Sequence, residues 1–191
     1  MLNRLAALIS LIFSPFLVPI AGTLVAVHAY ARTGLEFVRW SLISIAFSTG
    51  LPFVLIVVLV RLGMLSDMHI AIKEQRPGVL TLGLASALCG TFILHVIGAP
   101  KAIVWLGITY AINGVVFLVL TQMWKISFHT GVTAGCVTAL TLMVNSNFAW
   151  FFLLLLPIAW ARIYRKRHTF IQAIAGGGLA VIVTKLVLWQ F

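Results

Sequence analysis

Acidic residues are almost absent from this sequence: 3 of its 191 residues are Asp or Glu, and only 8% are charged. A soluble domain has about 25% charged residues, so the composition excludes an ordinary water-soluble fold. The three carboxylates, Glu36, Asp67 and Glu74, are also too few to form the oxygen cluster that holds Mg²⁺. We therefore expect no metal and no other cofactor.

Cysteine is scarce as well, with two residues in the whole chain, Cys89 and Cys136. They lie in separate apolar runs, which is typical of small packing residues, and they predict neither a disulfide framework nor a metal site.

Hydrophobic residues dominate the chain, at 62% of the sequence with a mean hydropathy of +1.16. A membrane-spanning helix needs about 20 mostly apolar residues, so this length suffices for six or seven spans. The apolar run at the N-terminus is longer than the about 7–15 residues of a signal-peptide core, so we expect it to be a membrane helix. The sequence predicts an all-α, polytopic membrane helix bundle of six or seven transmembrane helices, with residues 1–191 forming a single membrane-embedded domain. In a prokaryote such a protein would lie in the plasma membrane.

The apolar runs are bounded by charged or turn-forming residues, which set the expected helix ends. The expected helices cover residues of about 5–30, 41–64, 78–98, 102–123, 129–144, 148–164 and 172–190.

Three polar stretches interrupt these runs: residues 66–78 (the first polar stretch), 125–129 (the second) and 162–172 (the third). Two expected helices separate each stretch from the next. An even number of crossings returns the chain to the same side of the membrane, so all three stretches are expected on one face.

The polar stretches are rich in cations and histidines, a combination that suits a phosphate group. If the first stretch is helical, His69, Lys73 and Arg76 share one face of that helix. Ser127 and His129 lie where the fifth expected helix begins, and the backbone N–H groups of a helix start favour an anion. Nucleic acid is not an expected partner, because the cations lie in short loops without a soluble module.

Several of these residues also have simpler interpretations. Arg165, Lys166 and Arg167 are typical of topology signals and of lipid-headgroup contacts at a membrane edge. His28 and His95 fall within expected helices and are interpreted as structural. The glycines at 131, 135 and 176–178 favour close packing of helices.

The order of the polar stretches resembles the three signature motifs of the type 2 phosphatidic acid phosphatase superfamily, integral-membrane lipid phosphate phosphatases. Those motifs are Lys, six residues and Arg-Pro; Pro-Ser-Gly-His; and Ser-Arg, five residues, His, three residues and Asp. The matching residues are Arg76-Pro77 for the first motif, Ser127 and His129 for the second, and Arg162 and His168 for the third. The phosphatase-like core would cover residues of about 41–190.

The sequence departs from the motifs at five positions. His69 stands where the first motif has lysine, with Lys73 one turn later, and the second motif reads Ile126-Ser127-Phe128-His129. In the third motif Ala161 replaces serine and Gln172 replaces the closing aspartate, which in the family orients the nucleophilic histidine. The Gln172 oxygen is expected to accept the imidazole N–H without supplying a charge.

The resemblance implies a metal-independent lipid phosphatase that works through a phosphohistidine. His168 would be the nucleophile, His129 the proton donor to the leaving lipid, and Gln172 the residue that fixes the tautomer of His168. The implied phosphate-binding residues are Arg76, Arg162, Lys73, Ser127 and His69. The implied partner in the bilayer is a lipid phosphate: phosphatidate, phosphatidylglycerophosphate or a polyprenyl phosphate or diphosphate.

Two alternatives remain open. One is a catalytically inactive relative that acts as a transporter or a lipid-binding membrane protein, and the other is a lipid phosphotransferase. Cations are more numerous on the face that carries the polar stretches, and the positive-inside rule therefore predicts a cytoplasmic site. The sequence makes no prediction of oligomeric state.

Overall fold

The computed structural model describes residues 1–66 and 76–191, with only the backbone described at Arg76. Its regular structure is helical throughout, and no strand occurs in either of these two ranges. The predicted all-α fold class is confirmed.

The chain divides into two compact units. Unit 1 comprises Met1–Ala29 and Trp124–Phe191, and unit 2 comprises Tyr30–Met123. Each unit is described by itself. The prediction of a single membrane-embedded domain stays a prediction.

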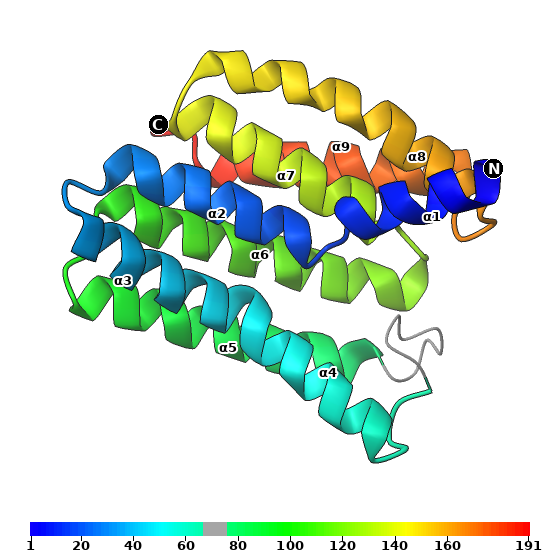
Figure 1. Ribbon diagram of the computed structural model, residues 1–191, viewed down its shortest axis with the longest axis horizontal. Coiled ribbons are helices and arrows are strands. Elements are labelled where there is room, and N and C mark those ends of the chain that lie inside the picture. Colours follow the sequence, from blue (N-terminus) through cyan, green and yellow to red (C-terminus); the bar gives the residue numbers. More distant parts are fainter. Residues whose placement is uncertain (67–75) are drawn as a thin grey trace. The chain divides into compact units, whose positions relative to one another are not determined.

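Unit 1 joins the two ends of the chain. Its helices are α1 (Leu2–Ile12), α2 (Leu17–Tyr30), α7 (Phe128–Met143), the 3₁₀ helix η3 (Ser146–Leu154), α8 (Leu155–Tyr164) and α9 (Phe170–Val187). The largest contact in the unit is between α7 and α9, which lie side by side in Figure 1, and α1 packs against α8. Gly135 of α7 faces α9, where a Cβ would make ordinary van der Waals contact at 3.4 Å from Thr184 Oγ1 and 3.6 Å from the Ala180 Cβ.

The first expected helix is broken, which corrects the prediction of one continuous helix over residues 5–30. Helices α1 and α2 are bent by 43° at the break between them. Pro15 lies in the break, and proline lacks the N–H that a continuing helix would need. Ser14 Oγ accepts a hydrogen bond from the Leu17 N–H at 3.2 Å, so that α2 begins with a new cap.

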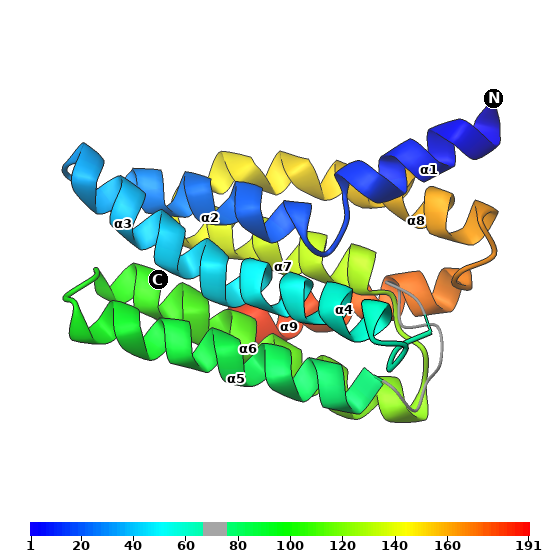
Figure 2. The same ribbon diagram turned by 60° about the horizontal axis from the view of Figure 1, so that its bottom comes forward.

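Unit 2 consists of α3 (Gly34–Ile45), a π-helical turn η1 (Ala46–Gly50), α4 (Leu51–Arg61), α5 (Arg76–Val96) and α6 (Lys101–Met123). Figure 2 shows α5 and α6 running side by side, and α3, η1 and α4 all pack along α5. Helix α3 begins seven residues before the expected position 41, because Thr33 caps it by accepting a hydrogen bond from the Glu36 N–H. Gly98 turns the chain between α5 and α6 with a φ of 76°.

Five helical segments of the described chain are long and apolar enough to cross a membrane, and the number is six when the bent pair α1–α2 counts as one span. The 16-residue α7 is apolar but shorter. These helices indicate a multi-pass membrane protein.

Candidate functional site

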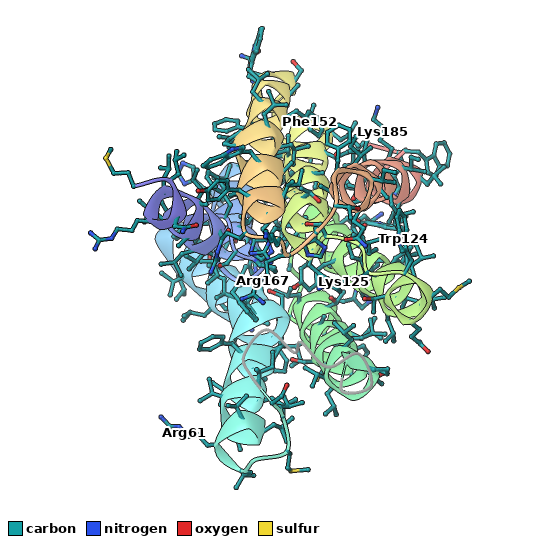
Figure 3. The ribbon with its side chains drawn as sticks, turned by 90° about the vertical axis from the view of Figure 1, so that its right-hand side faces the viewer. Arg61, Trp124, Lys125, Phe152, Arg167 and Lys185 are labelled. Carbon is teal, nitrogen blue, oxygen red and sulfur yellow. The ribbon has the colours of Figure 1, made fainter. Side chains whose placement is uncertain are left out.

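The second and third polar stretches meet in unit 1, every residue of which the structure describes. The Ser127 N–H donates to the Gln172 carbonyl oxygen at 3.2 Å. Thr130 Oγ1 donates to the Ala173 carbonyl oxygen at 2.8 Å. These bonds join the start of α7 to the start of α9, at the end of the unit that faces the viewer in Figure 3, where Lys125 and Arg167 are labelled. The second and third polar stretches thus meet, and the prediction that all three lie on one face of the membrane stays a prediction.

A glycine makes this junction possible. A Cβ at Gly176 would lie 2.5 Å from the Ser127 carbonyl oxygen and 3.1 Å from both Ser127 N and Thr130 Oγ1. Real Cβ atoms do not approach backbone so closely, so any larger residue would push α9 away from α7.

Ser127 begins α7 as its N-cap, with the side chain accepting a hydrogen bond from the Thr130 N–H. The whole residue is buried, at 0% exposure. Its hydroxyl is therefore engaged in holding the helix start in this conformation. The predicted contact of Ser127 with phosphate stays a prediction.

Arg162 is the buried cation of the site, with 6% of its surface exposed. Its Nε is buried and has no hydrogen-bond partner in the described chain. Arg165 and Arg167 lie close enough to Arg162 to repel its charge. A buried guanidinium surrounded by like charges is costly unless an anion compensates it.

No such anion comes from within unit 1. Its sequence has no Asp or Glu, whereas its cations are Arg4, Lys125, Arg162, Arg165, Lys166, Arg167 and Lys185. An anionic ligand would supply the missing negative charge.

The turn after α8 carries the third polar stretch back toward α9. The Arg167 N–H donates to the Arg162 carbonyl oxygen at 3.0 Å, and the Lys166 N–H donates to the Ile163 carbonyl oxygen at 2.8 Å. This pair of hydrogen bonds is a Schellman motif, a helix C-terminus in which the residue directly after the C-cap has a left-handed backbone and is usually glycine. Here it is Lys166, with a φ of 52°. The left-handed backbone costs this residue about 1 kcal/mol, so the turn retains a cation at the expense of local stability.

His168 follows this turn, and its ring is half-buried. The pKa of His168 is lowered from 6.5 to about 4, first by burial and then by the charges of Arg162 and Lys125, against smaller opposing effects of the Lys125 backbone and the Gln172 side chain. Nδ1 is buried and makes no hydrogen bond of good geometry with any described residue. The imidazole is therefore neutral at pH 7, the form in which a histidine is a nucleophile.

The side chain of Gln172 takes part in a helix cap, besides its effect on the pKa of His168. Its Oε1 accepts a hydrogen bond from the Thr169 N–H at 3.0 Å, while Thr169 Oγ1 accepts one from the Gln172 N–H at 3.3 Å. The two residues form a capping box at the start of α9. The oxygen predicted to accept the imidazole N–H of His168 thus also serves the helix cap, and its predicted role in fixing the tautomer of His168 stays a prediction.

His129 lies in the first turn of α7 and is buried, with 8% of its surface exposed. Its Nε2 lies 3.2 Å from the Ser10 carbonyl oxygen in α1. A carbonyl oxygen only accepts, so Nε2 carries a hydrogen in this arrangement. Helix α1, outside the expected phosphatase-like core, therefore contributes to the site.

The structure does not test the remaining predicted residues. His69 and Lys73 lie outside the described residues, and Arg76 begins α5 in unit 2. His28 and His95 are exposed on α2 and α5. Their interpretation as structural residues is not tested.

Ser10, Thr130 and Thr169 were not identified from the sequence as residues of the site. Gly176 was noted only as a packing residue, and its contact with Ser127 was not predicted. Thr169 had a signal, because Thr-x-x-Gln before an apolar run is the signature of a capping box. The contacts of Ser10 and Thr130 depend on tertiary packing and have no local pattern.

Comparisons with protein-family models, with curated proteins and with solved structures found no match to this chain. The resemblance to the lipid phosphate phosphatases therefore rests on the quoted motif residues.

Proposed function

We propose that this chain is a multi-pass membrane phosphatase that hydrolyses a lipid phosphate or diphosphate through a phosphohistidine on His168. The observation that carries the proposal is the buried Arg162 beside a neutral, half-buried His168 in a unit without any acidic side chain. A cationic site with a neutral nucleophile suits an anionic, electrophilic centre, and a phosphoryl group is both.

The phosphoryl oxygens bind to Arg162, whose planar guanidinium matches them, and to Lys125 at the start of the second polar stretch. These fixed positive charges stabilise the negative charge that spreads over the oxygens in the transition state. The first polar stretch also contributes predicted phosphate ligands, namely Lys73, Arg76 and His69.

In the first half-reaction His168 forms a bond to phosphorus and the bond from phosphorus to the lipid oxygen breaks. We assign the attack to Nε2, because Nδ1 of His168 is buried. His129 gives a proton to the leaving oxygen.

In the second half-reaction water attacks phosphorus and gives a proton to His129. The bond from phosphorus to nitrogen breaks, inorganic phosphate leaves, and His168 returns to its neutral form. Each residue thus ends the cycle in the state in which it began.

Lipid substrates reach the site laterally, because it lies at helix ends next to the bilayer. We place the site on the cytoplasmic face of the membrane, because the loops on the side of the polar stretches carry more Lys and Arg than the loops on the other side. Carboxylate ligands for a divalent cation are lacking in the sequence of unit 1, so the reaction is proposed to proceed without one.

The test is phosphate release by the detergent-purified chain in EDTA, from a panel of lipid monophosphates and diphosphates. We expect release by the wild type, loss in His168→Ala, and no change in His95→Ala, which removes an exposed histidine of unit 2. The melting temperature of each variant checks its folding.

Release by His168→Ala at the wild-type rate would contradict the proposal. Absence of release from every lipid, with folded wild-type protein, would also contradict it and would favour an inactive or transferring relative. Loss of activity in EDTA would overturn the metal-independent mechanism.

A further inference from the structure

The backbone around His168 is fixed from both sides. Upstream, the Schellman turn ties Arg167 to Arg162, and the His168 N–H also points to the Arg162 carbonyl oxygen at 3.4 Å. Downstream, Thr169 is the N-cap of α9, with φ −82° and ψ 165°. His168 thus occupies the position directly before the N-cap of α9.

Both halves of the capping box are present, and both belong to the residues next to His168. Thr169 Oγ1 and Gln172 Oε1 each accept the backbone N–H of the other residue, at 3.3 Å and 3.0 Å. The side chain of Gln172 therefore restrains the backbone of Thr169, one bond from His168.

We propose that Thr169 and Gln172 act together as positioning residues, and that the cap they form orients His168 through the backbone. The proposal rests on the proposed function and extends it to Thr169. It also explains why a neutral glutamine can stand where the resembling motif has aspartate: glutamine at the third position of a helix completes a capping box with threonine.

The two residues form one cap, so replacing either residue is expected to disrupt the whole cap. Thr169→Val removes the acceptor hydroxyl and keeps the size of the side chain, and Gln172→Ala removes the reciprocal acceptor. Loss of a cap moves the backbone of a residue that needs accurate placement. We expect each variant to lower kcat roughly tenfold with little change in KM.

The double variant separates this mechanism from direct action of Gln172 on the imidazole. If the cap acts as a unit, the double variant loses roughly the same tenfold as each single variant. If Gln172 acts on the ring directly, its removal lowers kcat by a further factor in the Thr169→Val background. That additive result would overturn the proposal.

Two control variants distinguish positioning from general stability. Thr169→Ser keeps a capping hydroxyl and should restore kcat relative to Thr169→Val. Thr33→Val removes the equivalent cap of α3 in unit 2 and should lower the melting temperature by a similar amount without lowering kcat. A fall of kcat in Thr33→Val equal to that in Thr169→Val would contradict a positioning role.

A second readout does not require turnover, and so separates failure of this proposal from failure of the proposed function. Diethyl pyrocarbonate acylates neutral imidazole, and mass spectrometry measures its reaction at His168. We expect Thr169→Val, Gln172→Ala and the double variant to show the same rise in labelling rate over the wild type. A rate in Thr169→Val equal to that of the wild type, or additive effects, would overturn the proposal even if no lipid is hydrolysed.

Discussion

Arg162 combines a buried position with a charge that no acidic side chain of unit 1 compensates, which is unfavourable for this unit unless an anion binds there. The guanidinium has no acidic partner available in unit 1, and Arg165 and Arg167 repel it. A functional site keeps such a group because the ligand compensates it, at a cost in stability before the ligand binds.

Arg162→Met tests this trade-off, because methionine fills a similar volume without a charge. We expect the ligand-free variant to melt a few degrees above the wild type. Phosphate or vanadate should stabilise the wild type, by about 2.7 kcal/mol at a hundredfold excess over Kd, and should not stabilise the variant. Equal stabilisation of both proteins by the anion, followed by thermal melting in detergent, would show that Arg162 does not bind it.

His168 gives the stability of the protein a pH dependence of definite sign. Its pKa is about 4 in the folded protein, below the ordinary value of 6.5, chiefly because of burial. As the pH falls the unfolded chain therefore binds a proton first, so the stability associated with neutral His168 is complete above pH 6.5 and is lost between pH 6.5 and pH 4.

His168→Asn removes this titration. We expect the melting temperature of the variant to fall less than that of the wild type between pH 7 and pH 4.5. A variant with the same pH dependence as the wild type would mean that His168 titrates at its ordinary value.

At the scale of the helices, the contact of α7 with α9 depends more on Gly176 than on Gly178. Gly176 lies against the backbone of Ser127, whereas a Cβ at Gly178 would meet nothing within 4 Å. The run of three glycines therefore contains one position that excludes a side chain and one that does not.

Gly176→Ala and Gly178→Ala form a matched pair. We expect Gly176→Ala to lower the melting temperature and the rate of phosphate release together, because it displaces the start of α7. Gly178→Ala should be neutral or stabilising by up to about 1 kcal/mol, since alanine favours a helix over glycine. Equal effects of the two substitutions on stability and activity would refute the assigned contact.

The helices themselves could largely be predicted from the sequence, because apolar runs and turn residues set their ends. The expected helix at 102–123 is α6 at Lys101–Met123, and the one expected at 148–164 is η3 with α8. The break at Pro15, the π-helical turn at Ala46–Gly50 and the 3₁₀ form of η3 were not predicted. They are local departures that keep the hydrophobic pattern unchanged, so hydropathy does not reveal them.

The candidate site was predictable in part. Counting membrane crossings predicted the second and third polar stretches on the same side, because the number of helices between them is even whatever the packing of those helices. The cap of Thr169 and Gln172, the contact of Gly176 with Ser127 and the hydrogen bond of His129 to Ser10 required coordinates, because each depends on backbone atoms brought together by tertiary packing.

At the scale of the whole molecule, the proposed orientation is open to labelling with a membrane-impermeant thiol reagent. Cys89 and Cys136 are free thiols, so both are first replaced by alanine. We expect Lys166→Cys to be labelled only after the membrane is permeabilised, and Lys101→Cys, on the opposite face by the count of crossings, to be labelled in intact cells. The reverse pattern would place the site outside the cell.

The central claim is that His168 carries a phosphoryl group during the reaction. The most direct measurement is acid-free quenching of the wild type with a ³²P-labelled lipid phosphate, followed by mapping of the labelled peptide. The account predicts an acid-labile, alkali-stable phosphate on His168 that is absent from His168→Asn. Phosphate release by the wild type without label on His168, or with label on another residue, would contradict it.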